Sequence, residues 1–127
     1  MHDHYYGTLR QSIVDTLRAG TDVLVDIDVQ GAKTIRKSTD PFISDSLVDI
    51  FIMPPSLEEL RHRLEKRGTE SAGQIDFRLT NAAAEMKCWR EYKYTIISGS
   101  MEEDLTKFRA ITRAERYLSR RIISLEG

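Results

Sequence analysis

Three arginines on two neighbouring segments are the residues of this chain best suited to chemistry. Arg63 and Arg67 are four residues apart, so they share one face of a predicted helix, and Arg78 lies on the next predicted helix. Guanidinium groups around the intervening loop, residues 68–71, can close over a polyphosphate, because their donor forks match phosphate oxygens. Their charge can also stabilise a transferring phosphoryl group. The alternative is solvated helix faces with local salt bridges, such as Glu59 with Arg63.

Two carboxylates, Asp26 and Asp28, sit at the C-terminal end of an apolar segment that predicts a buried strand over residues 23–28. In parallel α/β sheets, ligands bind outside the carboxyl ends of the strands. Acids placed there can hold Mg²⁺ or hydrogen-bond a nucleotide. The alternative is that both are turn-forming acids at a strand end.

A third group of polar residues precedes the first predicted helix, residues 9–19. The hydroxyls of Tyr6 and Thr8 at a helix N-terminus suit an anion or base pocket. Alternatively, Thr8 only caps the helix and the tyrosines pack at a rim. The histidines lack metal-site spacing and are expected at the surface.

The elements that must position these residues alternate between strand and helix. After the first helix we expect strand 23–28, helix 32–37, strand 47–53, a helix from Ser56 to about residue 66, helix 71–89, strand 94–97 and helix 100–119. Ser56 with Glu59, and Ser100 with Glu103, have capping-box spacing. Gly68 is a natural helix stop. This alternation predicts an α/β fold with a parallel sheet.

Composition narrows the class of protein. The 127 residues, 40% of them hydrophobic, make one domain at most, and a net charge of −1 argues against a dedicated nucleic-acid or membrane-surface binder. A single cysteine, Cys88, excludes an internal disulfide framework and a multi-cysteine zinc site. No apolar run approaches the roughly 20 residues of a membrane span. We therefore expect a cytoplasmic protein without a membrane or nucleic-acid partner.

The 127 residues contain no G-x-x-x-x-G-K-[ST] loop that would cradle phosphates. Several short motifs nevertheless occur in an order that resembles the guanylate kinase family. They are Tyr5-Tyr6-Gly7-Thr8, Asp26-Ile27-Asp28-Val29-Gln30-Gly31, Ile52-Met53-Pro54-Pro55-Ser56, Arg63-Leu64, Arg67-Gly68-Thr69-Glu70-Ser71, Arg78-Leu79, Tyr92-Lys93-Tyr94 and Arg113-Ala114-Glu115-Arg116. Each motif is modest alone, whereas their joint order and spacing are highly specific.

The resemblance implies a role for each candidate residue on the GMP side. Tyr6 resembles the tyrosine that hydrogen-bonds the GMP phosphate, and Thr8 the hydroxyl that reads guanine. Asp28 resembles the acid on the guanine side of that pocket. Asp26 matches the strand-end acid near Mg²⁺ and the phosphates, which makes it an indirect metal residue.

On the ATP side, the resemblance makes Arg63, Arg67 and Arg78 the arginines of a lid, about residues 63–78, that clamps the transferring phosphoryl group. The implied reaction is transfer of the γ-phosphoryl of ATP, with Mg²⁺, to GMP. Three departures stand out. The family begins with a strand, a phosphate-binding loop and the first part of the GMP-binding region, which supplies arginines and a glutamate for GMP, and these parts are missing here. Ser98-Gly99-Ser100 replaces the family's Asn-Asp-Asp-like residues beside adenine, and Ala72-Gly73 replaces acidic lid residues.

The implied fold is a three-layer α/β fold of the P-loop NTPase type that lacks its N-terminal P-loop strand. Residues 1–127 would form a partial guanylate kinase-like domain, its C-terminal two-thirds. In the family the missing strand lies between the strands expected here at 23–28 and 47–53. Those two strands then pair directly, or a homodimer or strand swap covers them, or the chain is a fragment of a longer kinase. We expect the chain itself to be a weak or inactive kinase.

Three other functions stay open. Guanylate kinase-like domains of scaffold proteins bind peptides without catalysis, although retained Asp28, Arg67 and Arg78 argue against that role. The substrate could be AMP or UMP, although Tyr6, Thr8 and Asp28 favour guanine. The third alternative is a non-functional gene remnant.

Overall fold

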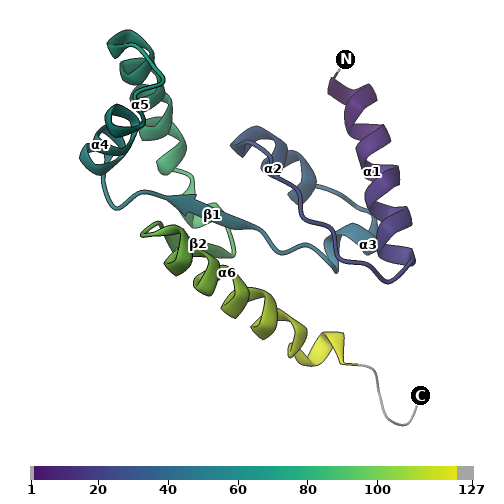
Figure 1. Ribbon diagram of the computed structural model, residues 1–127. Helices are drawn as coiled ribbons and strands as arrows, with labels where there is room; N and C mark the ends of the chain where they lie inside the picture. Colours follow the sequence, from purple (N-terminus) through teal and green to yellow (C-terminus); the bar gives the residue numbers. More distant parts are fainter. Residues whose placement is uncertain (1, 123–127) are drawn as a thin grey trace. The chain divides into compact units, whose positions relative to one another are not determined.

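The computed structural model describes residues 2–122, with side chains described from residue 10 onward, and it forms two units that divide after Leu47 (Figure 1). Unit 1 is helical, and unit 2 contains the sheet. None of the described helices combines the length and the apolar character that crossing a membrane requires.

Unit 1 contains the helices α1 (His2–Arg18), α2 (Val29–Arg36) and α3 (Pro41–Ser44). Its core consists of Val14, Ile35 and Ile43, each at most 8% exposed, with Ile13 and Leu47 packed against them. Asp40 caps α3 by accepting from the Phe42 N–H at 2.9 Å, and its other carboxylate oxygen accepts from Arg10 at 3.2 Å. This cap and ion pair connect α1 to α3.

The strand predicted over residues 23–28 is wrong, because this segment has no regular secondary structure and Leu24 is 80% exposed. A strand needs the hydrogen bonds of a neighbouring strand, and the described part of unit 1 offers none. The first helix also differs from its prediction, since α1 already includes residues 2–8, where we expected a cap. Helix 32–37 is confirmed as α2, shifted slightly toward the N-terminus.

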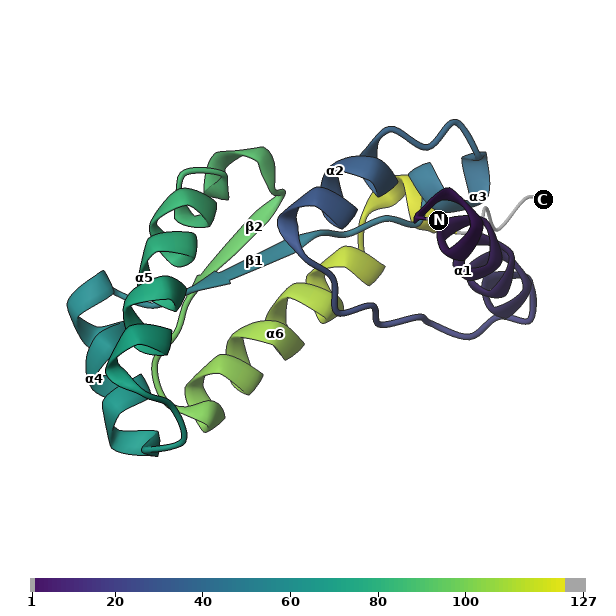
Figure 2. The same cartoon turned by 90° about the horizontal axis from the view of Figure 1, so that it is seen from above.

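Unit 2 is built on a parallel pair of strands, β1 (Ile50–Met53) and β2 (Tyr94–Ile97), with Ile52 opposite Ile96 (Figure 2). Asp49 holds the start of this pair by accepting from two backbone N–H groups, that of Lys93 at its Oδ1 (2.8 Å) and that of Tyr94 at its carbonyl oxygen (3.3 Å). Pro54 and Pro55 follow β1 directly and cannot donate to a ladder. Both strands therefore match predicted ones, although β1 is shorter than expected.

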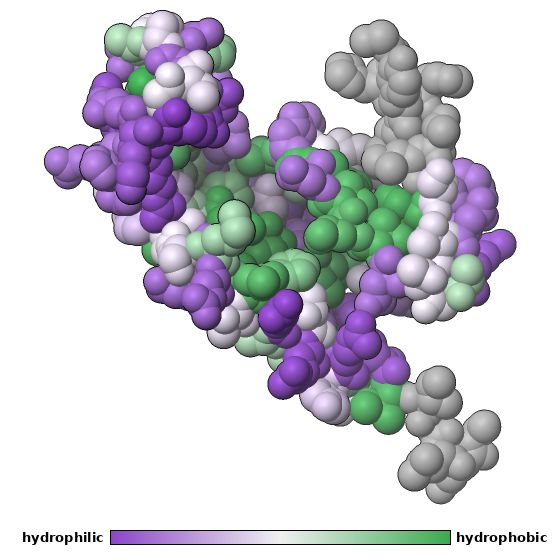
Figure 3. All heavy atoms as spheres, viewed as in Figure 1, coloured by the Kyte–Doolittle hydropathy of each residue, from purple (hydrophilic) through white to green (hydrophobic). Residues whose placement is uncertain are grey.

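One helix, α6 (Met101–Arg116), packs against β2. Ile96 on β2 is 2% exposed, whereas Ile52 beside it on β1 is 56% exposed. Figure 3 shows apolar surface at the strands, in contrast to the hydrophilic surface of the helices that connect them. On the face that carries Ile52 and Ile96, β2 is thus covered more completely than β1.

The connection from β1 to β2 contains α4 (Leu57–Arg67) and α5 (Ala72–Met86), which lie side by side in both ribbon views (Figures 1 and 2). Their buried residues are Leu64 and Ile75, at 8% and 5% exposure. This helical pair carries all three candidate arginines.

The predicted helix ends agree with the structure where the signal is a local cap. Ser56 accepts from the Glu59 N–H at 3.0 Å, and Ser100 with Glu103 forms a complete capping box. The helix predicted over 71–89 instead ends at Met86, followed by a 3₁₀ turn, η1 (Trp89–Glu91). The chain must leave the helix there, because Lys93 and Tyr94 are already bonded to Asp49.

A buried carboxylate, Glu115, fixes α6 to the sheet. Only 3% exposed, it accepts hydrogen bonds from Tyr94 and from Lys93, and it pairs with Arg121 in the final 3₁₀ turn, η2 (Ser119–Arg121), at 3.5 Å. Burial alone would raise the pKa of Glu115, but the hydrogen bonds from Tyr94 and Lys93 and the charges of Lys93 and Arg121 outweigh it and lower this pKa. The hydrogen bond that Tyr94 donates to Glu115 also raises the pKa of Tyr94.

Replacing Glu115 with Gln is expected to destabilise unit 2 by about 2 kcal/mol at neutral pH, since it removes a buried charged acceptor from Tyr94 and Lys93. A lowered folded-state pKa stabilises the fold above the ordinary glutamate value of 4.5. That stabilisation disappears as the pH falls through the folded-state pKa. Urea unfolding from pH 7 to pH 3 measures the difference between wild type and Glu115→Gln. Exposed Glu85→Gln is the control, and a difference that does not shrink below pH 4.5 would contradict the assignment.

Two glycines offer a matched test of the helix boundaries. Gly68 ends α4 with φ +69°, so Gly68→Ala is expected to cost about 1 kcal/mol for backbone conformation, although no atom crowds the new methyl group. Gly73 lies inside α5 with open space around it, so Gly73→Ala is expected to gain up to about 1 kcal/mol. Hydrogen exchange of the α4 and α5 amides measures the stability change of each variant. Stability changes of the same sign in the two variants would contradict these predictions.

Candidate functional site

The turn between α4 and α5 is fixed at both ends by local hydrogen bonds. Gly68 donates its N–H to the Leu64 carbonyl, which closes α4. Ser71 begins α5 with a capping box, in which its hydroxyl accepts from the Gln74 N–H and the Gln74 side chain accepts from the Ser71 N–H. Four residues therefore separate two well-defined helix ends, and arginines flank them on both sides.

Two of the three predicted arginines converge on one carboxylate oxygen. Oε1 of Glu70 lies 2.9 Å from Nη2 of Arg67 and 2.6 Å from Nε of Arg78. The Glu70 side chain is 11% exposed, whereas those of Arg67 and Arg78 are 53% and 58% exposed. The carboxylate thus lies beneath two guanidinium groups that face solvent.

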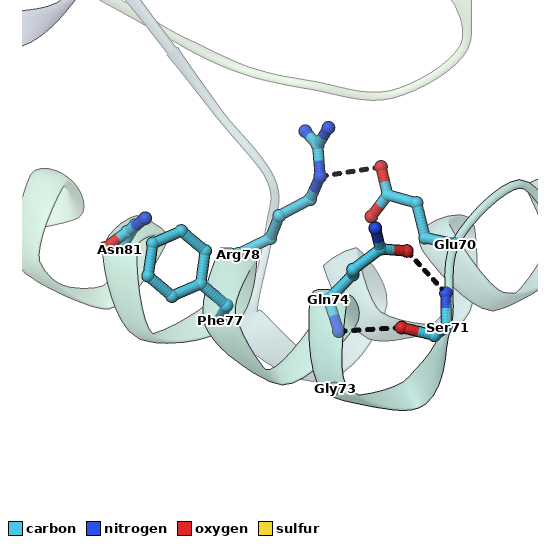
Figure 4. A pocket seen from close by; sticks show the side chains of 7 residues that line it. All are labelled: Glu70, Ser71, Gly73, Gln74, Phe77, Arg78 and Asn81. Atoms are coloured by element: carbon cyan, nitrogen blue, oxygen red, sulfur yellow. Dashed lines mark hydrogen bonds and ion pairs between the residues drawn. The ribbon is translucent and has the colours of Figure 1, made fainter.

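Several donors of these arginines have no partner among the residues that the structure describes. Arg67 uses Nε toward Thr69 and Nη2 toward Glu70, and Arg78 uses only Nε. Figure 4 shows the terminal amino groups of Arg78 pointing away from Glu70, beside an open hollow. The side chains that line the hollow come from the turn and from α5: Glu70, Ser71, Gly73, Gln74, Phe77, Arg78 and Asn81. The arrangement can present unused N–H groups to an anion.

Arg63 is held at a different place, the carboxyl end of β2. It donates from Nη1 to the Ser98 hydroxyl at 3.0 Å and from Nη2 to the Ser98 carbonyl at 3.1 Å, while Nε pairs with Glu59. The structure thus brings two arginines together and gives the third other partners. Carboxyl ends of parallel strands are where ligands of α/β sheets bind, so Arg63 occupies a relevant position.

A carboxylate on α6 organises the segment after β2. Asp104 accepts from the Gly99 N–H at 2.8 Å and from the Ser98 hydroxyl at 2.7 Å. These two hydrogen bonds, that of Gly99 first, lower the pKa of Asp104. The residues that depart from the family pattern, Ser98, Gly99 and Ser100, therefore have structural partners at the N-terminus of α6.

The two predicted acids belong to unit 1 and differ in their local roles. Asp28 caps α2, since its carboxylate accepts from the Gly31 N–H at 2.7 Å. Asp26 is exposed and forms no hydrogen bond or ion pair with any described residue. It does not end a strand, contrary to the prediction. Tyr6 and Thr8 lie outside the residues whose side chains the structure describes.

No group of three or more histidine, cysteine, aspartate or glutamate side chains suited to a metal ion occurs among the described residues. Magnesium in phosphoryl-transfer sites is commonly held by one or two carboxylates plus substrate phosphates, so a single exposed acid such as Asp26 fits that chemistry.

Sequence reasoning missed two acids of this site, Glu70 and Asp104. Glu70 carries a signal in its spacing, because it lies three residues after Arg67 and close to Arg78 in sequence. Asp104 carries a weaker signal, an acid in the first turn of a helix. Neither spacing reveals that one oxygen pairs with two arginines or that Asp104 accepts a hydrogen bond from Ser98.

Comparisons with known proteins all point to the same family. The guanylate kinase family model matches residues 1–115. Guanylate kinase of Bartonella henselae is 40% identical over 126 residues, 99% of this chain and 55% of that protein. Guanylate kinase of Dechloromonas aromatica is 43% identical over 114 residues, 90% of this chain and 54% of that protein.

A solved structure agrees with them. The crystal structure of guanylate kinase from Anaplasma phagocytophilum matches with a TM-score of 0.70 at 32% identity, covering 92% of this chain and 53% of that one. The predicted α/β fold with a parallel sheet is thereby confirmed. The chain spans about half the length of the relatives it matches. Because the family model covers most of the sequence, the chain belongs to the guanylate kinase family.

Proposed function

We propose that the complete protein transfers the γ-phosphoryl group of ATP to GMP, giving ADP and GDP. The observation that carries this proposal is the convergence of Arg67 and Arg78 on Glu70, at the positions where the family resemblance expects a phosphoryl clamp. Two guanidinium groups can offset charge that spreads over the transferring phosphoryl oxygens. Such catalysis depends on positioning and electrostatics and needs no covalent protein intermediate.

The other assignments follow the resemblance and the local chemistry. Arg63 would contribute its remaining donors at the carboxyl end of β2, within a lid of about residues 63–78. Tyr6, Thr8 and Asp28 would bind GMP. When Mg²⁺ is bound with ATP it neutralises phosphate charge, and Asp26 would lie in its region. A cytoplasmic location, and a homodimer or strand swap at the sheet, stay predictions.

The 127-residue chain itself is expected to be a weak or inactive kinase, because it contains no phosphate-binding loop motif. The measurement is GMP-dependent ADP formation with ATP and Mg²⁺, beside Arg67→Ala. Arg61→Ala is the matched control, since Arg61 is a half-exposed arginine of the same helix that pairs with Glu65 and Asp76. Turnover that Arg67→Ala abolishes and Arg61→Ala keeps would refute the prediction of a weak chain and support the clamp.

Binding of GMP tests the substrate independently of turnover. Asp28→Asn keeps an acceptor for the cap of α2 but removes the charge, so it is expected to weaken GMP binding about tenfold without unfolding the helix. Asp40→Asn is the matched control, because Asp40 also caps a helix of unit 1. Calorimetric titration with GMP, AMP and UMP gives the affinities and the base preference. Equal affinity of wild type and Asp28→Asn would remove Asp28 from the site.

The main rival is a binding module without catalysis, as in guanylate kinase-like scaffold domains. A phosphoryl clamp has no purpose in such a module, so paired Arg67 and Arg78 speak against it. A protein partner that binds equally well to wild type and Arg67→Ala, together with no binding of GMP or ATP, would favour the module.

A further inference from the structure

We propose that Glu70 is a positioning residue that assembles Arg67 and Arg78 into one site for the phosphate groups of a nucleotide. This inference deepens the proposed function and rests on it for the identity of the ligand. The site is defined by the carboxylate of Glu70 and the two guanidinium groups bonded to it.

Because Arg67 and Arg78 share one oxygen of Glu70, their guanidinium groups must lie close together. Because Nη2 of Arg67 and Nε of Arg78 both contact Oε1 of Glu70, these nitrogens can be no farther apart than the two distances combined. Two guanidinium groups that close repel each other, and the intervening carboxylate offsets the repulsion. Glu70 therefore keeps two arginines from different helices within reach of one ligand.

The charge balance leaves the assembly ready for an anion. Two positive groups face one carboxylate, and Glu70 is the least exposed of the three side chains at 11%. Unused N–H groups remain on both arginines, and those of Arg78 point away from Glu70 in Figure 4. A phosphate group could accept from these donors while Glu70 stays bound.

The turn has closing contacts other than this ion pair. Gly68 and Ser71 already fix the adjoining helix ends through backbone and capping hydrogen bonds. Oε2 of Glu70 is buried without a hydrogen-bond partner among the described residues, which costs stability. A role in holding the arginines accounts for a carboxylate that is buried with one oxygen unpaired and the other shared by two guanidinium groups.

The test is calorimetric titration of the 127-residue chain with inorganic tripolyphosphate at 0.15 M NaCl. Glu70→Gln is expected to bind about tenfold more weakly than wild type, since the donors lose their alignment. Glu65→Gln is the matched control, because Glu65 is a carboxylate of α4 that also pairs with an arginine. Any general gain in positive potential from removing a carboxylate appears in both variants, so the control is expected to bind at least as well as wild type.

A second variant and a second readout separate positioning from folding. Arg78→Lys keeps the charge but has one ammonium group to share between Glu70 and the ligand, so it is also expected to weaken binding about tenfold. In NMR spectra, the Nε–H signals of Arg67 and Arg78 are expected to shift on tripolyphosphate addition in wild type and in Glu65→Gln, and to shift much less in Glu70→Gln.

The outcomes distinguish this inference from the proposed function. Glu70→Gln binding tripolyphosphate as tightly as Glu65→Gln, or more tightly, would overturn the inference, as would absence of binding to wild type. GMP binding, measured in parallel, reports on the proposed function separately. If the wild-type chain does not bind GMP while Glu70→Gln still binds tripolyphosphate more weakly than Glu65→Gln, the proposed GMP roles of Tyr6, Thr8 and Asp28 in this chain are rejected and the role of Glu70 stands.

Discussion

The backbone hydrogen bonds that pair β1 with β2 in parallel are the interaction on which unit 2 depends. They fix the register of Ile52 opposite Ile96, and Asp49 secures the start of the pair. A parallel pair requires a long crossover, which here contains α4 and α5. The pairing also aims both carboxyl ends the same way, so the residue after β2, Ser98, meets Arg63 from the crossover. The strand pair thus decides where one arginine lies, and the crossover carries the other two.

Carboxylates help to hold the three candidate arginines in place. Glu70 serves Arg67 and Arg78 together, and Asp104 orients Ser98, which in turn accepts from Arg63. Arg67 is held along one edge, through Nε to Thr69 and Nη2 to Glu70, and Arg78 is held through Nε alone, so both keep N–H donors unused. A planar group held by one edge loses less freedom when a ligand binds at another, so binding costs less conformational entropy. Fixed arginines are also the preorganised charges that phosphoryl transfer requires.

The parts of this fold that could be predicted from the sequence are those set by neighbours in the chain. Ser56, Gly68 and Ser100 marked helix ends correctly, because a cap bonds a backbone group a few residues away. Strand 94–97 was also predicted correctly. The strand predicted over residues 23–28 is wrong, because apolar β-branched residues favour an extended backbone but form a strand only where a second strand pairs with them. In the site, the four-residue spacing of Arg63 and Arg67 predicts that they share a helix face. The hydrogen bond from Arg63 to Ser98 joins residues 35 positions apart, and no spacing rule predicts it.

The buried Glu115 and its three donors constrain how this sequence can change over evolutionary time. Substituting the acid removes the acceptor of Lys93 and Tyr94 and the ion pair with Arg121, and substituting one of these three partners leaves a buried negative charge less well compensated. Single replacements at these four positions are therefore expected to destabilise the fold, even though none of them lies in the proposed phosphate site. Drift there requires paired, compensating substitutions, so the four residues are expected to be inherited as a block among sequences that keep α6 against the sheet.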